Sequence, residues 1–331
     1  MSRYFTFLVL YMMVMACNPP KARNAITDPL PSWNEGPTKE AIVEFVTHTT
    51  NPDDRYFIPE EERIAVFDND GTLWSERPYY FQFEFAFDMV RAHAAGHDEW
   101  KEEQPFKGIL ENDYASAFAS GDDNIGKLLV ATHTGMYNDV FEQTVSGWID
   151  TARHDVNGRL YRDLVFQPML ELLDYFRANG FTTYIVSGGS IAFMQPWTEQ
   201  LYDIPSEQVI GSRFKLVYEY TDNGPELYRA PQFEFLNDKG GKVISISQVI
   251  GKRPVAAFGN SDGDLAMLRY TADGNGMRLM AYIHHTDAER EYAYDRDSPV
   301  GELDEGLDVA RANNWLLVDM KKDWKTIYPG N

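Results

Sequence analysis

Two aspartates follow a short apolar segment near residue 64, and their spacing would let them serve one site. The segment Ile64–Phe67 reads IAVF, and Asp68, Asp70 and Gly71 come directly after it. An apolar run of this length that stops at an Asp-Gly pair predicts a buried strand followed by a turn. Carboxylates at the carboxyl end of a strand lie where open parallel sheets bind their ligands. Taken alone, the motif fits a solvated turn equally well.

Two later segments repeat this arrangement of an apolar run followed by small polar residues. The run 181–186 (FTTYIV) ends at Ser187-Gly188-Gly189-Ser190, and the run 254–258 ends at GNSDGD, residues 259–264. Glycines before a helix leave backbone N–H groups free for an anion, although an ordinary strand-to-helix turn looks the same in sequence. Lys239 and Lys242 lie between these two segments, in a glycine-rich stretch that leads into a helical pattern.

The remaining periodicity predicts an α/β fold with a parallel, doubly wound sheet. A helical pattern over 169–178 stops at Asn179-Gly180 just before the strand at 181–186, which is the order of a parallel crossover. Segments 209–220 and 226–235 predict an antiparallel pair, and 278–283 predicts the last strand. The polar stretch 284–296 is expected to form a helix. His284 and His285 at its start could touch a ligand or a metal, but paired histidines there are more often surface residues.

Residues 76–163 have a different, largely helical pattern. The aromatic run 79–89 fits a helix that is buried over a wide arc, and strand-like alternation is the alternative. Further helical segments are expected near 114–119, 125–132 and 140–149, separated by Gly and Asp. We expect this block to be an insertion placed over the strand ends. Its aromatic residues are more often core than a ligand-binding surface.

The N-terminus has the pattern of a bacterial lipoprotein signal. Residues 1–17 contain one arginine, an apolar run too short to span a bilayer, and Cys17, the only cysteine of the chain. Acylation of Cys17 would place the protein on a membrane in the periplasm; a signal that is cleaved elsewhere, or a buried helix, is the alternative. Residues 18–37 are rich in Pro, Asn and Asp and predict a tether, and a helix is expected over 38–47.

Composition limits the classes of function. The chain has 331 residues, 44% of them hydrophobic, and a formal net charge of -21. This length and apolar content describe a globular protein with a large core. The negative charge argues against a nucleic-acid partner, which requires clustered Lys and Arg. It also gives an anionic substrate no long-range attraction, so a phosphate site must depend on a local lysine, backbone amides and a metal ion.

The order of the motifs DND, SGGS and GNSDGD, with a lysine before the last, resembles the haloacid dehalogenase superfamily of phosphohydrolases over residues 60–285. The likeness is to its phosphoserine-phosphatase-like branch, which carries a helical cap after the first motif. The resemblance implies that Asp68 is the nucleophile that forms an aspartyl-phosphate and that Asp70 is the general acid and base. It further implies that Ser187 and the Gly188 amide hold phosphoryl oxygens, and that Lys242 balances the charge.

The resemblance also implies a Mg²⁺ site, and here the sequence departs from the family pattern. The family binds the ion through the first aspartate, the backbone carbonyl of the second, and an acid of the last motif. These are Asp68 and Asp70, but the residue after Gly259 is Asn260, a weaker ligand. Asp264, and less surely Asp262, must then supply negative charge.

Two further assignments are left open. Lys242 is preferred as the catalytic lysine because it directly precedes the helical run, and Lys239 is the alternative. Glu76 lies one residue from the place where the resembling phosphatases have an acid that meets the amino group of the substrate.

The sequence therefore predicts a Mg²⁺-dependent phosphomonoesterase that acts on a small phosphorylated metabolite. Its catalytic core is expected over 38–75 and 164–331, and its cap over 76–163. The alternatives are a lipoprotein that binds a phosphorylated ligand without catalysis, and a phosphotransferase that uses the same aspartyl intermediate.

Overall fold

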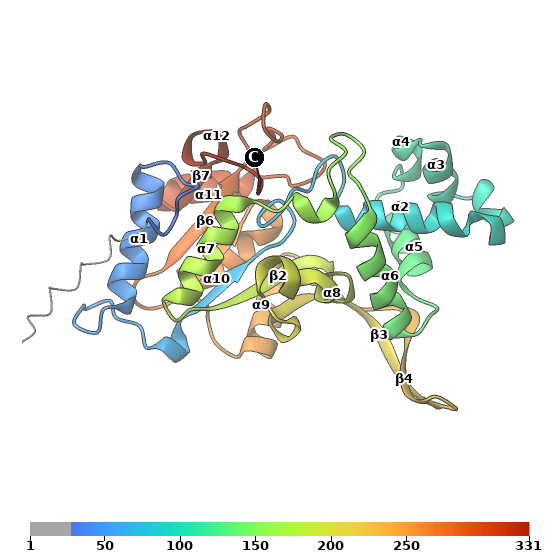
Figure 1. Ribbon diagram of the computed structural model, residues 1–331, viewed down its shortest axis with the longest axis horizontal. Helices are drawn as coiled ribbons and strands as arrows, with labels where there is room; N and C mark the ends of the chain where they lie inside the picture. Colours follow the sequence, from blue (N-terminus) through green and yellow to red (C-terminus); the bar gives the residue numbers. More distant parts are fainter. Residues whose placement is uncertain (1–27, 331) are drawn as a thin grey trace, which may run out of the picture.

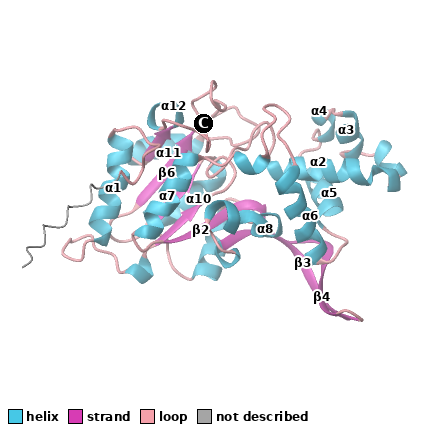
Figure 2. Cartoon of the chain, viewed as in Figure 1, coloured by secondary structure: helices cyan, strands magenta, loops and turns pink. Residues whose placement is uncertain are grey.

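A seven-stranded, mostly parallel sheet forms the centre of the computed structural model, which describes residues 28–330 (Figures 1 and 2). The strand order is β4-β3-β2-β1-β5-β6-β7, and only β4 runs antiparallel to its neighbour. The strands are β1 (Ile64–Phe67), β2 (Thr182–Ser190), β3 (Val209–Thr221), β4 (Gly224–Phe235), β5 (Ala256–Gly259), β6 (Leu279–His284) and β7 (Leu316–Asp319). The predicted α/β class is confirmed. The sheet continues past the strand expected to be last, because β7 pairs with β6.

Both faces of the sheet are covered by apolar packing, as in a doubly wound fold. Alternate residues of β1 point to opposite faces, so Phe67 belongs to one buried cluster and Val66 to the other. The helices of this core are α1 (Pro37–Thr50), α7 (Gln167–Ala178), α8 (Ile191–Tyr202), α9 (Gly240–Ser245), α10 (Leu265–Ala272), α11 (Glu305–Asn313) and α12 (Met320–Asp323). Burial on both faces explains why the central strands read as unbroken apolar runs.

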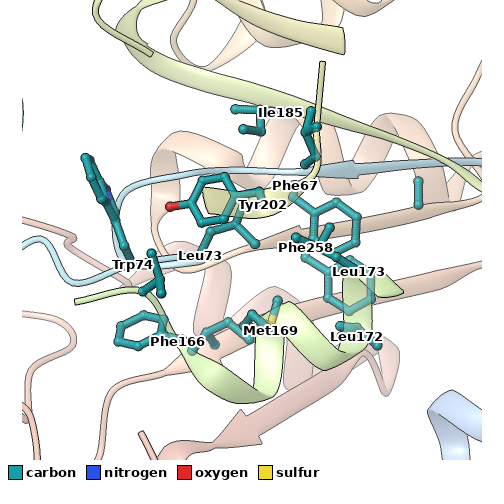
Figure 3. Packing of buried hydrophobic residues seen from close by; sticks show 14 of the residues in the cluster. Phe67, Leu73, Trp74, Phe166, Met169, Leu172, Leu173, Ile185, Tyr202 and Phe258 are labelled. Atoms are coloured by element: carbon teal, nitrogen blue, oxygen red, sulfur yellow. The ribbon is translucent and has the colours of Figure 1, made fainter. Parts of the chain in front are cut away.

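The core under the central strands is aromatic (Figure 3). Phe67 on β1 stacks on Phe258 of the neighbouring β5, with ring centroids 4.7 Å apart. Phe176 of α7 meets both rings edge-on, at 6.2 and 5.8 Å. Such aromatic pairs add about 0.5–1.5 kcal/mol each to the burial of their apolar area. They fix β1 against β5, and so fix the positions at which the two strands end.

The helices predicted between 76 and 163 are present and form a layer beside the sheet (Figure 1). They are α2 (Phe81–His93), α4 (Tyr114–Ala117), α5 (Asp122–His133) and α6 (Asn138–Thr151), and the same layer contains α3 (Phe106–Glu111), which was not predicted from the sequence. The aromatic run is therefore helical, and its Phe87 packs into a separate buried cluster with Trp100 and Leu128. The β3–β4 hairpin extends to this layer, where Arg229 of β4 donates its backbone N–H to Met136 O at 2.9 Å.

The segment before α1 packs against the end of the chain. Leu30 and Trp33 are fully buried, and the Trp33 ring lies 5.9 Å from that of Trp324. Residues 28–36 are thus part of the folded body, and the expected tether over 18–37 does not extend this far. The signal segment and Cys17 lie outside the described residues. Within residues 28–330, no helix has the length and apolar character needed to cross a membrane.

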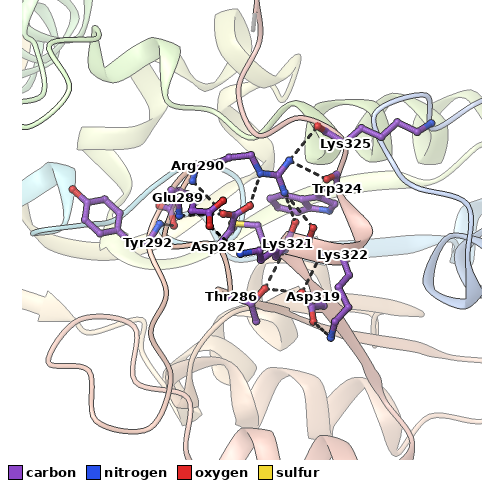
Figure 4. Close-up of polar contacts among 12 residues, drawn as sticks. Thr286, Asp287, Glu289, Arg290, Tyr292, Asp319, Lys321, Lys322, Trp324 and Lys325 are labelled. Carbon is purple, nitrogen blue, oxygen red and sulfur yellow. Dashed lines mark hydrogen bonds and ion pairs between the residues drawn. The ribbon is translucent and has the colours of Figure 1, made fainter.

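The polar stretch 284–296, where the sequence predicts a helix, contains turns instead. Asp287 accepts hydrogen bonds from the backbone N–H groups of Glu289 and Arg290, which competes with helix formation. The guanidinium of Arg290 then donates to the carbonyls of Trp324 and Lys325, both at 3.1 Å (Figure 4). These bonds anchor the β6–α11 loop, residues 285–304, to the C-terminal segment.

Candidate active site

The turn after β1 places the first two aspartates at the carboxyl end of the sheet. Asp68 donates its backbone N–H to Phe258 O at 2.9 Å, which extends the pairing with β5 by one residue. Asp70 accepts a hydrogen bond from Trp74 Nε1 at 2.8 Å, so its carboxylate is held in place. Gly71 has φ +68°, and a Cβ at this position would lie 2.0 Å from Asn260 Nδ2. Only glycine permits this turn and this close approach together.

Lys242, on α9, lies between two buried carboxylates. Its Nζ is 2.8 Å from Asp68 Oδ1 and 2.6 Å from Asp264 Oδ1, and only 2% of the residue is exposed. Burial alone would lower the pKa of Lys242, but the two carboxylates outweigh it and raise the pKa above its usual value. Lys239 is exposed at the start of the same helix. The geometry therefore favours Lys242 over Lys239 as the lysine of the site.

Burial shifts both aspartates toward their protonated forms. Desolvation is the main cause that raises the pKa of Asp68 to about 8; Asp264 and Asp70 add to this effect, and Lys242 opposes it. Desolvation also raises the pKa of Asp70 to about 6, and the hydrogen bond from Trp74 opposes that shift. A carboxyl group that titrates near pH 6 can release a proton and take one up at neutral pH.

The SGGS motif forms the irregular end of β2 and faces the aspartates. Ser187 is buried and its Oγ accepts the N–H of Gly189 at 3.0 Å, while Gly188 is exposed. A Cβ on Gly189 would lie 3.3 Å from Ser187 Oγ and 3.6 Å from Asp70 Oδ2. Gly189, which follows the predicted phosphate-binding residues Ser187 and Gly188, thus lies next to the second aspartate.

A side chain from α2 contacts this SGGS loop, and sequence reasoning did not identify it. Gln82 accepts the N–H of Ser190 at 2.8 Å, and its Nε2 lies 3.1 Å from Nε2 of the buried His133. Gln82 stands within the aromatic run, where it is the one position whose amide interrupts the apolar pattern. Glu84 and Asp88 also interrupt this run, so the sequence alone does not single out Gln82.

The two acids of the last motif, Asp264 and Asp262, make different contacts. Asp264 is fully buried, and its Oδ2 accepts the backbone N–H groups of Asn260 and Ser261 at 3.0 and 3.2 Å. Asp262 instead caps α11, because its carboxylate accepts the N–H groups of residues 304, 305 and 306. Asn260 is 2% exposed, and its amide lies beside the turn at Gly71. Of the three candidate ligands in this motif, Asn260 is the one whose side chain faces the first-motif turn.

Glu76 is buried in a polar cluster behind that turn. Its Oε1 accepts hydrogen bonds from Asn260 Nδ2 and Tyr294 Oη, both at 2.7 Å. Desolvation raises the pKa of Glu76 to about 8, although His285 opposes the shift. His285 is buried, stacks on Tyr294 at 4.4 Å and lies 2.7 Å from Gly71 O. The expectation of a surface position is therefore wrong for His285, whereas His284 is half-buried.

Comparison with known proteins places this geometry in a family. The sequence model of haloacid dehalogenase-like hydrolases matches residues 65–269, which is more than half of the chain. A solved structure of a conserved protein of unknown function from Anaerococcus prevotii DSM 20548 is similar at a TM-score of 0.53 and 16% identity, covering 79% of this chain and 89% of that one. A protein of unknown function from Bordetella pertussis Tohama I gives 0.51 and 15%, covering 78% and 99%.

These two structures share the fold. A phosphoserine phosphohydrolase-like protein from Francisella tularensis is also similar, at a TM-score of 0.38 and 17% identity, covering 67% of this chain and 87% of that one. Comparison with curated protein sequences gives no significant match. The family prediction made from the motifs is confirmed: the chain belongs to the haloacid dehalogenase-like hydrolases.

Proposed function

We propose that the protein is a phosphomonoesterase that hydrolyses a small organic phosphate with Asp68 as nucleophile and Mg²⁺ as cofactor. One observation carries the proposal: a buried carboxylate, a buried ammonium 2.8 Å from it, and a second carboxyl group lie together beside the Ser187 loop. Membership of a hydrolase family supports it.

The two aspartates have separate tasks in this reaction. A carboxylate oxygen of Asp68 attacks phosphorus, the bond from phosphorus to the ester oxygen breaks, and Asp70 gives its proton to the departing alcohol. Asp70 then takes a proton from water, which attacks phosphorus, releases inorganic phosphate and frees Asp68. The pKa of about 6 for Asp70 suits both steps. Ser187 and the Gly188 amide would hold phosphoryl oxygens during the transfer.

The residues present fit a magnesium ion in their donor chemistry. Mg²⁺ prefers oxygen ligands and keeps several waters, so it needs few protein groups. Asp68 would supply a carboxylate oxygen, Asn260 its amide oxygen, and Asp70 its backbone carbonyl, which accepts no hydrogen bond from residues 28–330. The same part of the chain contains no group of three His, Cys, Asp or Glu side chains that could hold a metal ion. When bound, the ion would reduce the repulsion between Asp68 and the phosphate dianion.

The two alternative functions depend on the same residues. A protein that only binds a phosphorylated ligand would have no task for Asp70, whose carboxyl group is held by Trp74 and is poised for proton transfer. A phosphotransferase would use the same aspartyl intermediate and differ only in the acceptor.

Release of phosphate from 4-nitrophenyl phosphate tests the proposal, with the full chain in mild detergent, with Mg²⁺ and with a chelator. We expect metal-dependent turnover that is lost in Asp68→Asn. Adding a short alcohol separates hydrolysis from transfer, because a transferase would form the new phosphate ester in place of free phosphate. Absence of turnover with any divalent metal, while a phosphorylated ligand still stabilises the fold, would support the binding protein instead.

A further inference from the structure

The acids of the last motif leave the proposed metal site short of negative charge. Asp264 is occupied on both oxygens, by Lys242 on Oδ1 and by two backbone N–H groups on Oδ2. Asp262 is occupied by the start of α11. Of the two side chains proposed as ligands, only Asp68 carries a charge, because Asn260 is neutral. A divalent cation at this place needs another nearby anion to balance it.

Glu76 is the carboxylate next to Asn260, and the fold provides a close-fitting position for its Oε1. A Cβ on Gly71 would lie 2.5 Å from this oxygen, and a Cβ on Gly301 only 1.9 Å from it. Both glycines have φ +68°. Tyr294 Oη donates to the same oxygen at 2.7 Å, and the β6–α11 loop that carries Tyr294 and Gly301 is anchored through Arg290. Substitution of either glycine would displace Glu76.

The hydrogen bond from Asn260 fixes the direction of its amide. Glu76 Oε1 accepts a hydrogen bond from Asn260 Nδ2 at 2.7 Å, so the Oδ1 of Asn260 points away from Glu76. There it accepts only a long bond, 3.3 Å, from the buried Thr72 Oγ1, which leaves a lone pair for another partner. An asparagine held in this way offers an oxygen in a fixed direction.

We propose that Glu76 is a positioning residue that orients Asn260 Oδ1 toward the cation and that, ionised when the cation binds, it supplies from the adjacent position the negative charge that Asn260 lacks. The inference rests on the proposed magnesium-dependent function. It assigns Glu76 to the cation rather than to an amino group of the substrate. Asn260 would supply the oxygen ligand and Glu76 the negative charge. In the family pattern a single carboxylate of the last motif supplies both.

Isothermal titration of Mg²⁺ into the full-length protein tests this inference without any turnover. In Glu76→Gln the side-chain oxygen can still accept the amide of Asn260, so the variant removes charge and keeps orientation. Loss of such an outer partner weakens metal binding by about 10–100-fold, and we expect a change of this size. Glu84→Gln is the matched control, since Glu84 is a buried carboxylate on α2 whose substitution should leave Mg²⁺ binding as in the wild type.

A reciprocal exchange makes the test specific. Combining Glu76→Gln with Asn260→Asp moves the carboxylate to position 260 and keeps one amide and one carboxylate in contact. We expect the double variant to bind Mg²⁺ more tightly than Glu76→Gln alone. Wild-type affinity in Glu76→Gln, or no recovery in a folded double variant, would overturn the role of Glu76 while the magnesium site stands. Absence of Mg²⁺ binding to the wild type would overturn the proposed cofactor itself, and this inference with it.

Discussion

Replacing Lys242 by methionine should destabilise the fold, and more so as the pH rises. The ammonium lies 2.8 and 2.6 Å from the carboxylates of Asp68 and Asp264, and all three side chains are nearly inaccessible to solvent. Methionine keeps a straight, unbranched chain but removes the cation, so both acids lose their partner. Removing one member of a buried ion pair costs about 3–5 kcal/mol in the free energy of unfolding, because the remaining charge is uncompensated.

The direction of the pH dependence follows from Asp68. Burial is the main cause that raises its pKa from 3.8 to about 8 in the folded protein, even with the lysine present. A carboxyl group with a raised folded pKa contributes stability that is fully present below its unfolded pKa and is lost as the pH rises through the folded value. Without Lys242 this folded pKa rises further. The difference between the variant and the wild type should therefore be small near pH 4 and largest near pH 9.

Thermal unfolding with a chelator, followed by circular dichroism, measures this difference. The described 303 residues have an unfolding entropy of about 0.6 kcal/mol/K, so a loss of 3–5 kcal/mol lowers Tm by about 5–8 °C. Lys239→Met is the matched control, because that side chain is exposed and its loss should change stability by less than about 0.5 kcal/mol. Equal changes in the two variants, or a Lys242→Met effect that shrinks as the pH rises, would refute the reasoning.

Four further results are expected. Asp70→Asn should lower kcat/KM by about 10²–10⁴-fold for phenyl phosphate but less for 4-nitrophenyl phosphate, whose leaving group needs little protonation; equal losses would contradict the role of Asp70 as an acid. With phenyl phosphate, wild-type kcat/KM should decline above about pH 6, where Asp70 loses its proton, and Asp70→Asn should lack this decline. Asp68→Asn should abolish turnover yet raise Tm near pH 9 in chelator, because it removes a carboxylate whose raised pKa makes ionisation costly; a lower Tm would count against it. Cys17→Ala should move the protein from the membrane to the soluble fraction, and a wild-type protein found soluble already would exclude the lipid anchor.

The strands and the residues at their ends could be predicted because their signals are local. An apolar run followed by Asp, Ser or Asn with Gly marks the end of a buried strand wherever it occurs. Parallel pairing then brings the ends of β1, β2 and β5 to one edge of the sheet, which is how Asp68, Ser187 and Asn260 come to lie near each other. No knowledge of side-chain contacts was needed for that step.

The residues that sequence reasoning missed make contacts between distant segments. Gln82 accepts a hydrogen bond from the N–H of Ser190, which lies 108 positions away in the sequence. Glu76 accepts one from Tyr294, which lies 218 positions away. Nothing in the local pattern of either segment shows which residue lies opposite. The loop with Tyr294 has no period, and its shape depends on the binding of Arg290 to the C-terminal segment. The contacts of Asp262 and Asp264 could not be predicted for a related reason. An aspartate that caps a helix and one that binds a metal look the same in the sequence.

The charges of the site explain why the proposed phosphate substrate would need a cation as partner there. Asp68, Asp70, Asp264 and Lys242 together carry a formal charge of -2 when all are ionised, and the chain around them adds a net negative charge. Two unit charges 4 Å apart repel by about 4 kcal/mol near a protein surface, so a phosphate dianion would be strongly disfavoured. Protonating Asp68 would relieve the repulsion but would also remove the charge of the nucleophile. In the proposed reaction a cation would relieve this repulsion and leave Asp68 ionised, so we expect cation binding and catalytic competence to coincide.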